Sequence, residues 1–137
     1  MARYPATEVV PDYYLPLVAV TLTVGNRSFL VKALVDSGAD GSVLRAESLK
    51  GLVPFSSLPP ASGDEAAGAG GAFEIRRLGG TLTFAQVEFR HGVAVAEPGA
   101  LPVSVLGRDD FFRHFVVRFE WFRDQPVFDV DPRPPGV

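Results

Sequence analysis

Apolar and polar residues alternate in short runs along most of the chain, which is the pattern of β-strands rather than of long helices. Residues 13–24 form a strongly apolar run rich in Val, Leu, Thr and Tyr. Gly25 and Asn26 then supply a two-residue, type II′-like hairpin turn into a second strand at 28–35. The pattern therefore predicts a β-hairpin that begins an all-β fold.

Further along the chain, the strands are shorter and helix is scarce. The pattern predicts strands at 81–84, 87–90 and 93–96 with a turn at His91 and Gly92, and a closing hairpin of 116–121 with 127–130. Residues 46–49 can form at most one helical turn, and 108–114 is the best helix candidate.

A length of 137 residues fits one domain with its own core. We place that domain at 13–130, after an N-terminal extension at 1–12 and before a flexible proline-rich tail at 131–137. The sequence contains no internal repeat, which excludes a fused, two-lobed enzyme.

The apolar run before Asp36 ends in Asp36-Ser37-Gly38, a motif that occurs once. A carboxylate at the end of a buried strand, followed by a hydroxyl and a glycine, is half of an aspartic protease site. That chemistry needs two carboxylates that share a proton, one to activate water and one to polarise the scissile carbonyl. With one copy per chain, the second Asp36 must come from another protomer, so the motif predicts a homodimer.

Within this half-site, Asp36 is the expected catalytic residue. Ser37 can anchor the two loops across the symmetry axis, and Gly38 allows close backbone approach. The mechanism needs no metal and no cofactor.

Three segments in order resemble the retropepsins, the single-domain proteases of retroviruses and their cellular and bacterial relatives. They are 31–44 (VKALVDSGADGSVL), 68–76 (GAGGAFEIR) and 105–109 (VLGRD). They correspond to the catalytic segment, the flap and the signature that opens the family's helix, and the resemblance spans about 13–122. It implies a closed β-barrel with one short helix after Gly107.

The resemblance also implies roles for further residues. Asp40 and Arg108 would form a partly buried ion pair that holds the helix against the catalytic loop. Residues expected to contact substrate, in the loop or in a glycine-rich flap hairpin, are Ala39, Gly68, Ala69, Gly70 and Gly71. The expected substrate is an extended peptide with hydrophobic side chains flanking the cleavage site.

The resemblance is to the cellular or bacterial branch of the family, and several parts depart from the viral pattern. The insertion at 51–65, the first twelve residues and the hairpin after Trp121 all extend beyond it. Because viral dimers interlace their short chain ends, the dimer interface is the least transferable feature.

Composition narrows the classes of function that remain open. Thirteen basic and sixteen acidic residues give a net charge of −3, which argues against a nucleic-acid partner. The chain has no cysteine, hence no disulfide and no thiol nucleophile. No signal core and no membrane-spanning apolar run is present, so the expected location is the cytoplasm.

Other interpretations remain. Asp36-Ser37-Gly38 can be a simple turn, and 61–72 can be a linker by composition. Residues 36–47 partly match a calcium-binding EF-hand loop, although Gly38 offers no ligand at its third position. The stronger rival is a retropepsin-fold dimer that binds peptides or mediates assembly with little proteolysis.

Overall fold

The computed structural model describes residues 2–49, 51–68 and 71–134, and only the backbone at 61–68 and 71. Its strands are β1 (Arg3–Pro5), β2 (Thr7–Val10), β3 (Tyr13–Leu15), β4 (Leu17–Val24), β5 (Arg27–Val35), β6 (Val43–Arg45), β7 (Pro60–Gly68), β8 (Gly71–Phe84), β9 (Val87–Ala96), β10 (Ser104–Leu106), β11 (Phe115–Glu120) and β12 (Val127–Pro132). The helical elements are the 3₁₀ turns η1 (Ala46–Leu49) and η2 (Phe55–Ser57) and one α-helix, α1 (Phe111–His114). No helix in the described ranges is long and apolar enough to cross a membrane.

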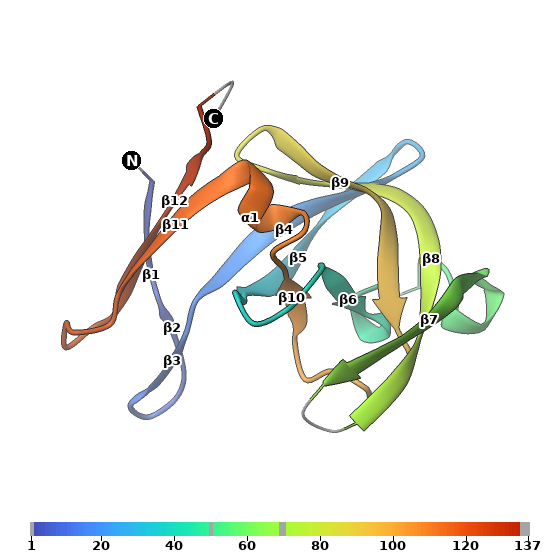
Figure 1. Ribbon diagram of the computed structural model, residues 1–137, viewed down its shortest axis with the longest axis horizontal. Helices are drawn as coiled ribbons and strands as arrows, with labels where there is room; N and C mark the ends of the chain where they lie inside the picture. The colour runs from blue at the N-terminus through green and yellow to red at the C-terminus, as the bar shows by residue number, and fades with distance from the viewer. Residues whose placement is uncertain (1, 50, 69–70, 135–137) are drawn as a thin grey trace.

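Seven strands form a curved sheet in the order β4-β5-β10-β6-β9-β8-β7. Antiparallel pairing of β8 with β4 at Thr21–Thr23 joins the two sides, so the sheet closes on itself as a barrel (Figure 1). Gly80 permits this closure, because a Cβ there would stand 2.9 Å from the Thr23 carbonyl oxygen. The β7–β8 hairpin extends from the barrel at the lower right of the view.

The core is filled by aliphatic side chains from the barrel strands and by a cluster of phenylalanines at one end. Phe111 of α1 stacks on Phe115 with ring centroids 4.6 Å apart, and both rings are fully buried. Phe84 and Phe89, from β8 and β9, meet them edge-on or tilted. This packing anchors α1 to the barrel, although α1 has only four residues and little helical stability of its own.

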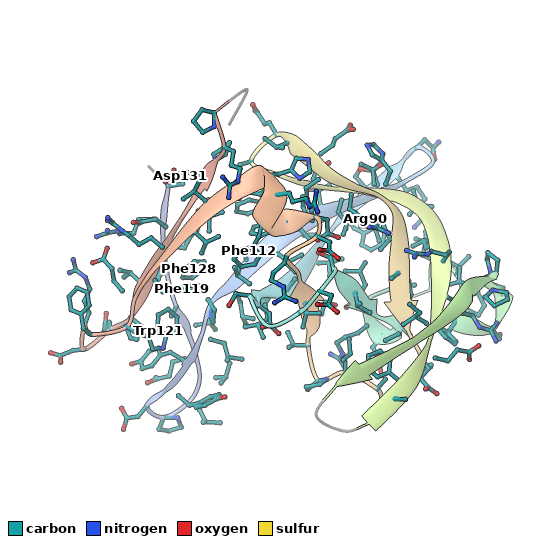
Figure 2. The ribbon with its side chains drawn as sticks, in the orientation of Figure 1. Arg90, Phe112, Phe119, Trp121, Phe128 and Asp131 are labelled. Carbon is teal, nitrogen blue, oxygen red and sulfur yellow. The ribbon has the colours of Figure 1, made fainter. Side chains whose placement is uncertain are left out.

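The two ends of the chain form a second sheet, in the order β1-β12-β11, beside the barrel (Figure 1). One face of this terminal sheet carries a row of aromatic rings, Tyr4, Phe128, Phe119 and Trp121, with neighbouring centroids 5.7–6.4 Å apart. Figure 2 labels the last three of them. The inner members of the row pack on the barrel core, whereas Phe119 and Trp121 are exposed.

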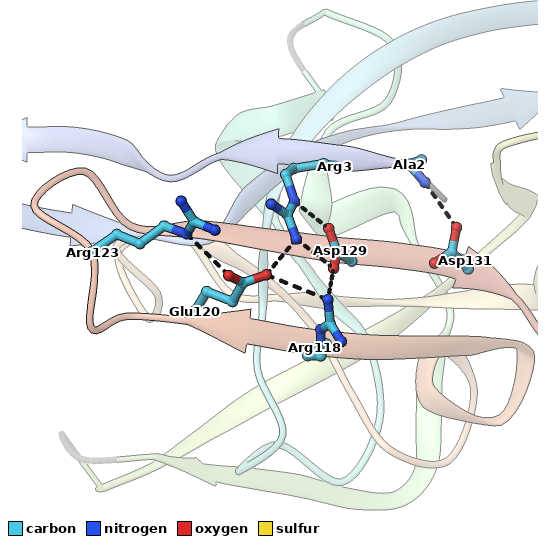
Figure 3. Close-up of polar contacts among 7 residues, drawn as sticks. All are labelled: Ala2, Arg3, Arg118, Glu120, Arg123, Asp129 and Asp131. Carbon is cyan, nitrogen blue, oxygen red and sulfur yellow. Dashed lines mark hydrogen bonds and ion pairs between the residues drawn. The ribbon is translucent and has the colours of Figure 1, made fainter.

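The opposite face of the terminal sheet carries an ion-pair network (Figure 3). Glu120 and Asp129 are buried there, and Arg3 bridges the two carboxylates. Arg118 and Arg123 complete the network. The hydrogen bond from Arg3, and secondarily its charge, holds the pKa of Asp129 below its usual range. Buried acids on this sheet are therefore paired with cations from separate strands.

The first predicted hairpin is confirmed in the structure. β4 and β5 pair from Val24↔Arg27 onwards around a two-residue turn with Gly25 at φ +60°. The predicted strand at 13–24 is, however, interrupted at Pro16, which has no backbone N–H to donate. The single helical turn at 46–49 is present as η1, and the closing hairpin is β11–β12.

Two expectations about local structure were wrong. Residues 91–92 are not a turn between strands, because β9 runs through them and Gly92 adopts φ +71° within it. The sheet absorbs this irregularity as a register shift opposite β8. Residues 131–132 are not part of a flexible tail, because they pair with 115–116 of β11. Strands β1 and β2 also occupy much of 1–12: β2 pairs with β3, and β1 pairs with β12, a distant partner that a sequence pattern cannot reveal.

Candidate active site

Asp36 lies immediately after β5, where the strand leaves the sheet. Its backbone N–H donates to the Leu106 carbonyl at 3.0 Å, which ties the start of the catalytic loop to β10. The carboxylate is half-buried, and Oδ1 accepts a hydrogen bond from the Gly38 N–H at 2.9 Å. Asp36 therefore sits at a fixed position with its second oxygen available to a ligand.

Gly38 lies in close contact with this carboxylate. A Cβ at that position would lie 3.1 Å from Asp36 Oδ1, closer than ordinary van der Waals contact. The Ala39 N–H donates to the Asp36 carbonyl at 3.1 Å, so the backbone turns tightly around the carboxylate. Asp36-Ser37-Gly38 is indeed a turn, but one that presents a carboxylate at the end of a buried strand.

The far side of the catalytic loop is clamped to the segment that precedes α1. Arg108 N–H donates to Ala39 O at 3.0 Å, and Asp109 N–H donates to Asp40 O at 2.7 Å. Gly107 packs directly on the loop backbone, because a Cβ there would lie 2.6–2.7 Å from three backbone atoms of Gly41. No other residue type fits at 107 without moving the loop.

A buried polar network completes the clamp, and sequence reasoning missed it. Ser42 Oγ donates to Asp110 Oδ1 at 2.6 Å, and Ser42 N–H donates to Asp110 Oδ2 at 3.1 Å. The same Ser42 hydroxyl accepts from Gly107 N–H at 3.1 Å. Asp110 also caps α1 by accepting from Phe111 N–H at 2.6 Å. An acidic N-cap directly before an apolar pair was the signal that could have identified Asp110.

Asp40 and Arg108 form the ion pair that the resemblance implied, with Arg108 Nη2 donating to Asp40 Oδ1. The expectation that it is partly buried was wrong for the single chain. The Asp40 side chain is 85% exposed and that of Arg108 is 56% exposed. Solvent screens such a pair, so the backbone bonds and the buried Ser42–Asp110 network contribute more to holding the loop.

The remaining predicted residues lie in two places. Ser37 is exposed on the catalytic loop beside half-buried Ala39. Gly68 and Gly71 are paired in register at the end of the β7–β8 hairpin, so 61–68 and 71–72 are strand rather than linker. Ala69 and Gly70, the expected flap tip, lie outside the described residues.

The EF-hand interpretation does not fit the structure. Strand β5 precedes the segment 36–47, and β6 occupies 43–45, so the chain does not wind around one point as an EF-hand loop must. Glu47, its last candidate ligand, instead accepts from the Gly99 N–H at 2.9 Å. Within the described ranges, no three acidic or histidine side chains gather as a metal site would require.

Comparison with known proteins identifies the fold. No protein-family model matches the chain, and no curated protein matches it. Among solved structures, the chain is similar to an EIAV protease complexed with the inhibitor HBY-793. The identity is 26% and the TM-score 0.54, over 69% of this chain and 83% of the viral one. The fold is therefore the all-β retropepsin fold, with one α-helix after Gly107 as expected.

Proposed function

We propose that this protein is an aspartic endopeptidase of the retropepsin type, in which two copies of Asp36 from a homodimer activate one water molecule. The observation that carries the proposal is the clamped Asp36 at the end of β5, in a fold shared with a retroviral protease. A relation to the cellular or bacterial branch remains part of the proposal, since the similar structure is viral.

Two carboxylates close to one another share a proton and titrate as a pair. The ionised Asp36 takes a proton from the water as it attacks the peptide carbonyl. The protonated Asp36 donates a hydrogen bond to the carbonyl oxygen, where negative charge develops. The Gly38 N–H holds Oδ1 of each carboxylate, which leaves Oδ2 to meet water or substrate.

A second chain is required because each chain has one Asp-Ser-Gly motif. The terminal sheet offers an apolar surface for it: Phe119 and Trp121 are each 41% exposed and Phe122 is 82% exposed. Both edges of β12 are already paired within the chain, by β1 and β11. β12 therefore has no free edge to interlace with a partner chain, and we place the dimer contact on the aromatic face of this sheet.

The β7–β8 hairpin is the proposed flap. It is long, and it leaves the barrel with glycines paired at Gly68 and Gly71. Closing over an extended peptide would exclude water from the reacting bond. The expected substrate is a peptide with hydrophobic side chains on both sides of the cleavage site.

The test is the Asp36→Asn variant, assayed on a denatured-protein mixture across pH. Cleavage should be abolished while the thermal unfolding profile is retained, and a statine-type peptide should inhibit the wild type. Asn cannot act as a base, so proteolysis that persists in the purified variant would refute the assignment.

Mixing the two proteins tests the shared site. With equal amounts and random exchange, about a quarter of dimers carry two Asp36 residues. Specific activity per wild-type chain should therefore fall by about half. Activity proportional to the wild-type fraction would mean that each chain acts alone. A dimer that forms but never cleaves would favour the peptide-binding alternative.

A further inference from the structure

Strand β5 has an unpaired edge that the catalytic function does not use. On one side it pairs with β4 along its whole length. On the other side β10 pairs only with Ala33, Leu34 and Val35. Among the described residues, no strand pairs with that second edge over 27–32.

Two hydrogen bonds establish which backbone groups face this edge. Val35 N–H donates toward β4, to Pro16 O, whereas Asp36 N–H donates toward β10, to Leu106 O. Because backbone groups alternate in direction along a strand, the even-numbered residues direct theirs to the open edge. Ser28, Leu30 and Lys32 therefore present N–H and C=O groups outward, ready to pair with another strand.

A groove runs along this edge. Its volume is about 700 Å³, within the roughly 300–1,000 Å³ typical of ligand sites. One wall is β5, and the other comes from β6, η1, the loop after η1 and the segment before β10, including Arg45, Leu52 and Val103. The Leu30 side chain is 69% exposed beside it. The groove lies beside the part of β5 that precedes its pairing with β10, which begins at Ser104.

The groove is basic although the chain is acidic overall. Arg27, Lys32 and Arg45 line it, against one acid, Glu47. That acid is already engaged: bonds from its own backbone N–H and from Gly99 hold its pKa below the usual range. Within the described part of the chain, buried Arg45 Nε has no hydrogen-bond partner, and Glu47 Oε1 is 3.7 Å away. Arg45 is therefore ion-paired with Glu47 but has an Nε–H without a hydrogen bond, and Arg27 and Lys32 are the further cations that favour an anionic ligand.

We propose that this groove is a docking site for an extended peptide segment that carries carboxylate side chains. The segment adds to β5 as a further strand, in line with β10. Its backbone pairs with Ser28, Leu30 and Lys32, and its carboxylates meet Arg27, Lys32 and Arg45. At about 3.3 Å per residue, Lys32 lies about 13 Å along the strand from Asp36, so the site is separate from the reacting carboxylates. The proposal does not depend on proteolysis.

The probe is a fluorescein-labelled octapeptide of alternating Val and Glu, added to full-length Asp36→Asn protein so that it cannot be cut. Amide hydrogen exchange is followed by NMR. With free peptide at ten times its Kd, exchange at Ser28, Leu30 and Lys32 should slow about tenfold. Phe29 and Val31, already paired with β4, should not change. The proposal would be overturned if the open-edge residues and the β4-paired residues were protected equally. It would also be overturned if the peptide slowed exchange only outside β5.

Charge is tested separately, by fluorescence anisotropy. The double variant Arg27→Gln/Lys32→Gln should weaken peptide binding by between about twofold and thirtyfold, the range for two exposed ion pairs. The control Arg113→Gln/Arg133→Gln removes two exposed charges outside the groove and should change Kd less than twofold. A peptide with Gln in place of Glu should bind more weakly. Equal binding of the Glu and Gln peptides would refute the preference for carboxylates. In the amide-exchange experiment, protection of the open edge of β5 without peptide would identify a second copy of this chain as the occupant.

Discussion

Ser42→Ala should destabilise the protein well beyond the loss of an ordinary serine. The hydroxyl donates to the buried Asp110 carboxylate at 2.6 Å, a bond to a charged group worth about 1.5–3 kcal/mol. Its removal also leaves the Gly107 N–H, which donates to Ser42 Oγ at 3.1 Å, without an acceptor in a buried site, at a cost of about 1–3 kcal/mol. The two effects overlap, and we expect a loss of about 3 kcal/mol in the free energy of unfolding.

Urea denaturation followed by Trp121 fluorescence measures this loss, at constant protein concentration so that self-association does not contribute. Ser57→Ala is the matched control, because its exposed hydroxyl donates only to the Pro54 carbonyl. That variant should lose less than about 0.5 kcal/mol. If Ser42→Ala is no more destabilised than Ser57→Ala, the buried network does not hold the loop as argued.

Three further outcomes are expected. Gly107→Ala should lower the free energy of unfolding by about 1–3 kcal/mol or more, because its Cβ would meet the Gly41 backbone at 2.6 Å. The control is Gly41→Ala, which should cost far less because a Cβ at Gly41 has open space. Urea denaturation of both variants measures the difference. Asp129, whose pKa is lowered by Arg3, stabilises the fold above its ordinary pKa of about 3.9 and loses that contribution as pH falls through its lower folded value. The stability difference between wild type and Asp129→Asn should therefore shrink below about pH 4 and stay constant at neutral pH, as acid-dependent denaturation curves would reveal. Trp121→Ser should raise the dimer dissociation constant by about thirtyfold, as sedimentation velocity would measure, and an unchanged constant would place the interface elsewhere.

Predictions from the sequence succeeded where the determining information is local. The apolar run before Asp36 required a buried strand, and Gly25-Asn26 required a tight turn, so β4, β5 and the position of the catalytic carboxylate followed. The first helical turn at 46–49 followed for the same reason. None of these needed knowledge of a distant partner.

Predictions failed where the partner is remote. The Ser42–Asp110 bond joins residues 68 positions apart, and neither residue alone indicates the other. Strand β1 has three residues, too few to show a period, and forms only because β12 lies beside it. Pairing with 115–116 of β11 drew 131–132 into a strand. The Asp40–Arg108 contact was anticipated, but its exposure depends on the surface around it.

The terminal sheet has a consequence for the order of folding. Arg3 contacts Asp129 across 126 positions, so closing this pair carries nearly the largest loop-closure entropy available to the chain. During synthesis β1 emerges first but finds its partner only after the last strand is made. We expect the barrel to form before this sheet. If the dimer contact lies on its aromatic face, a chain that has not yet reached β12 has no complete surface for pairing, and proteolytic competence would arise only after β12 has been made.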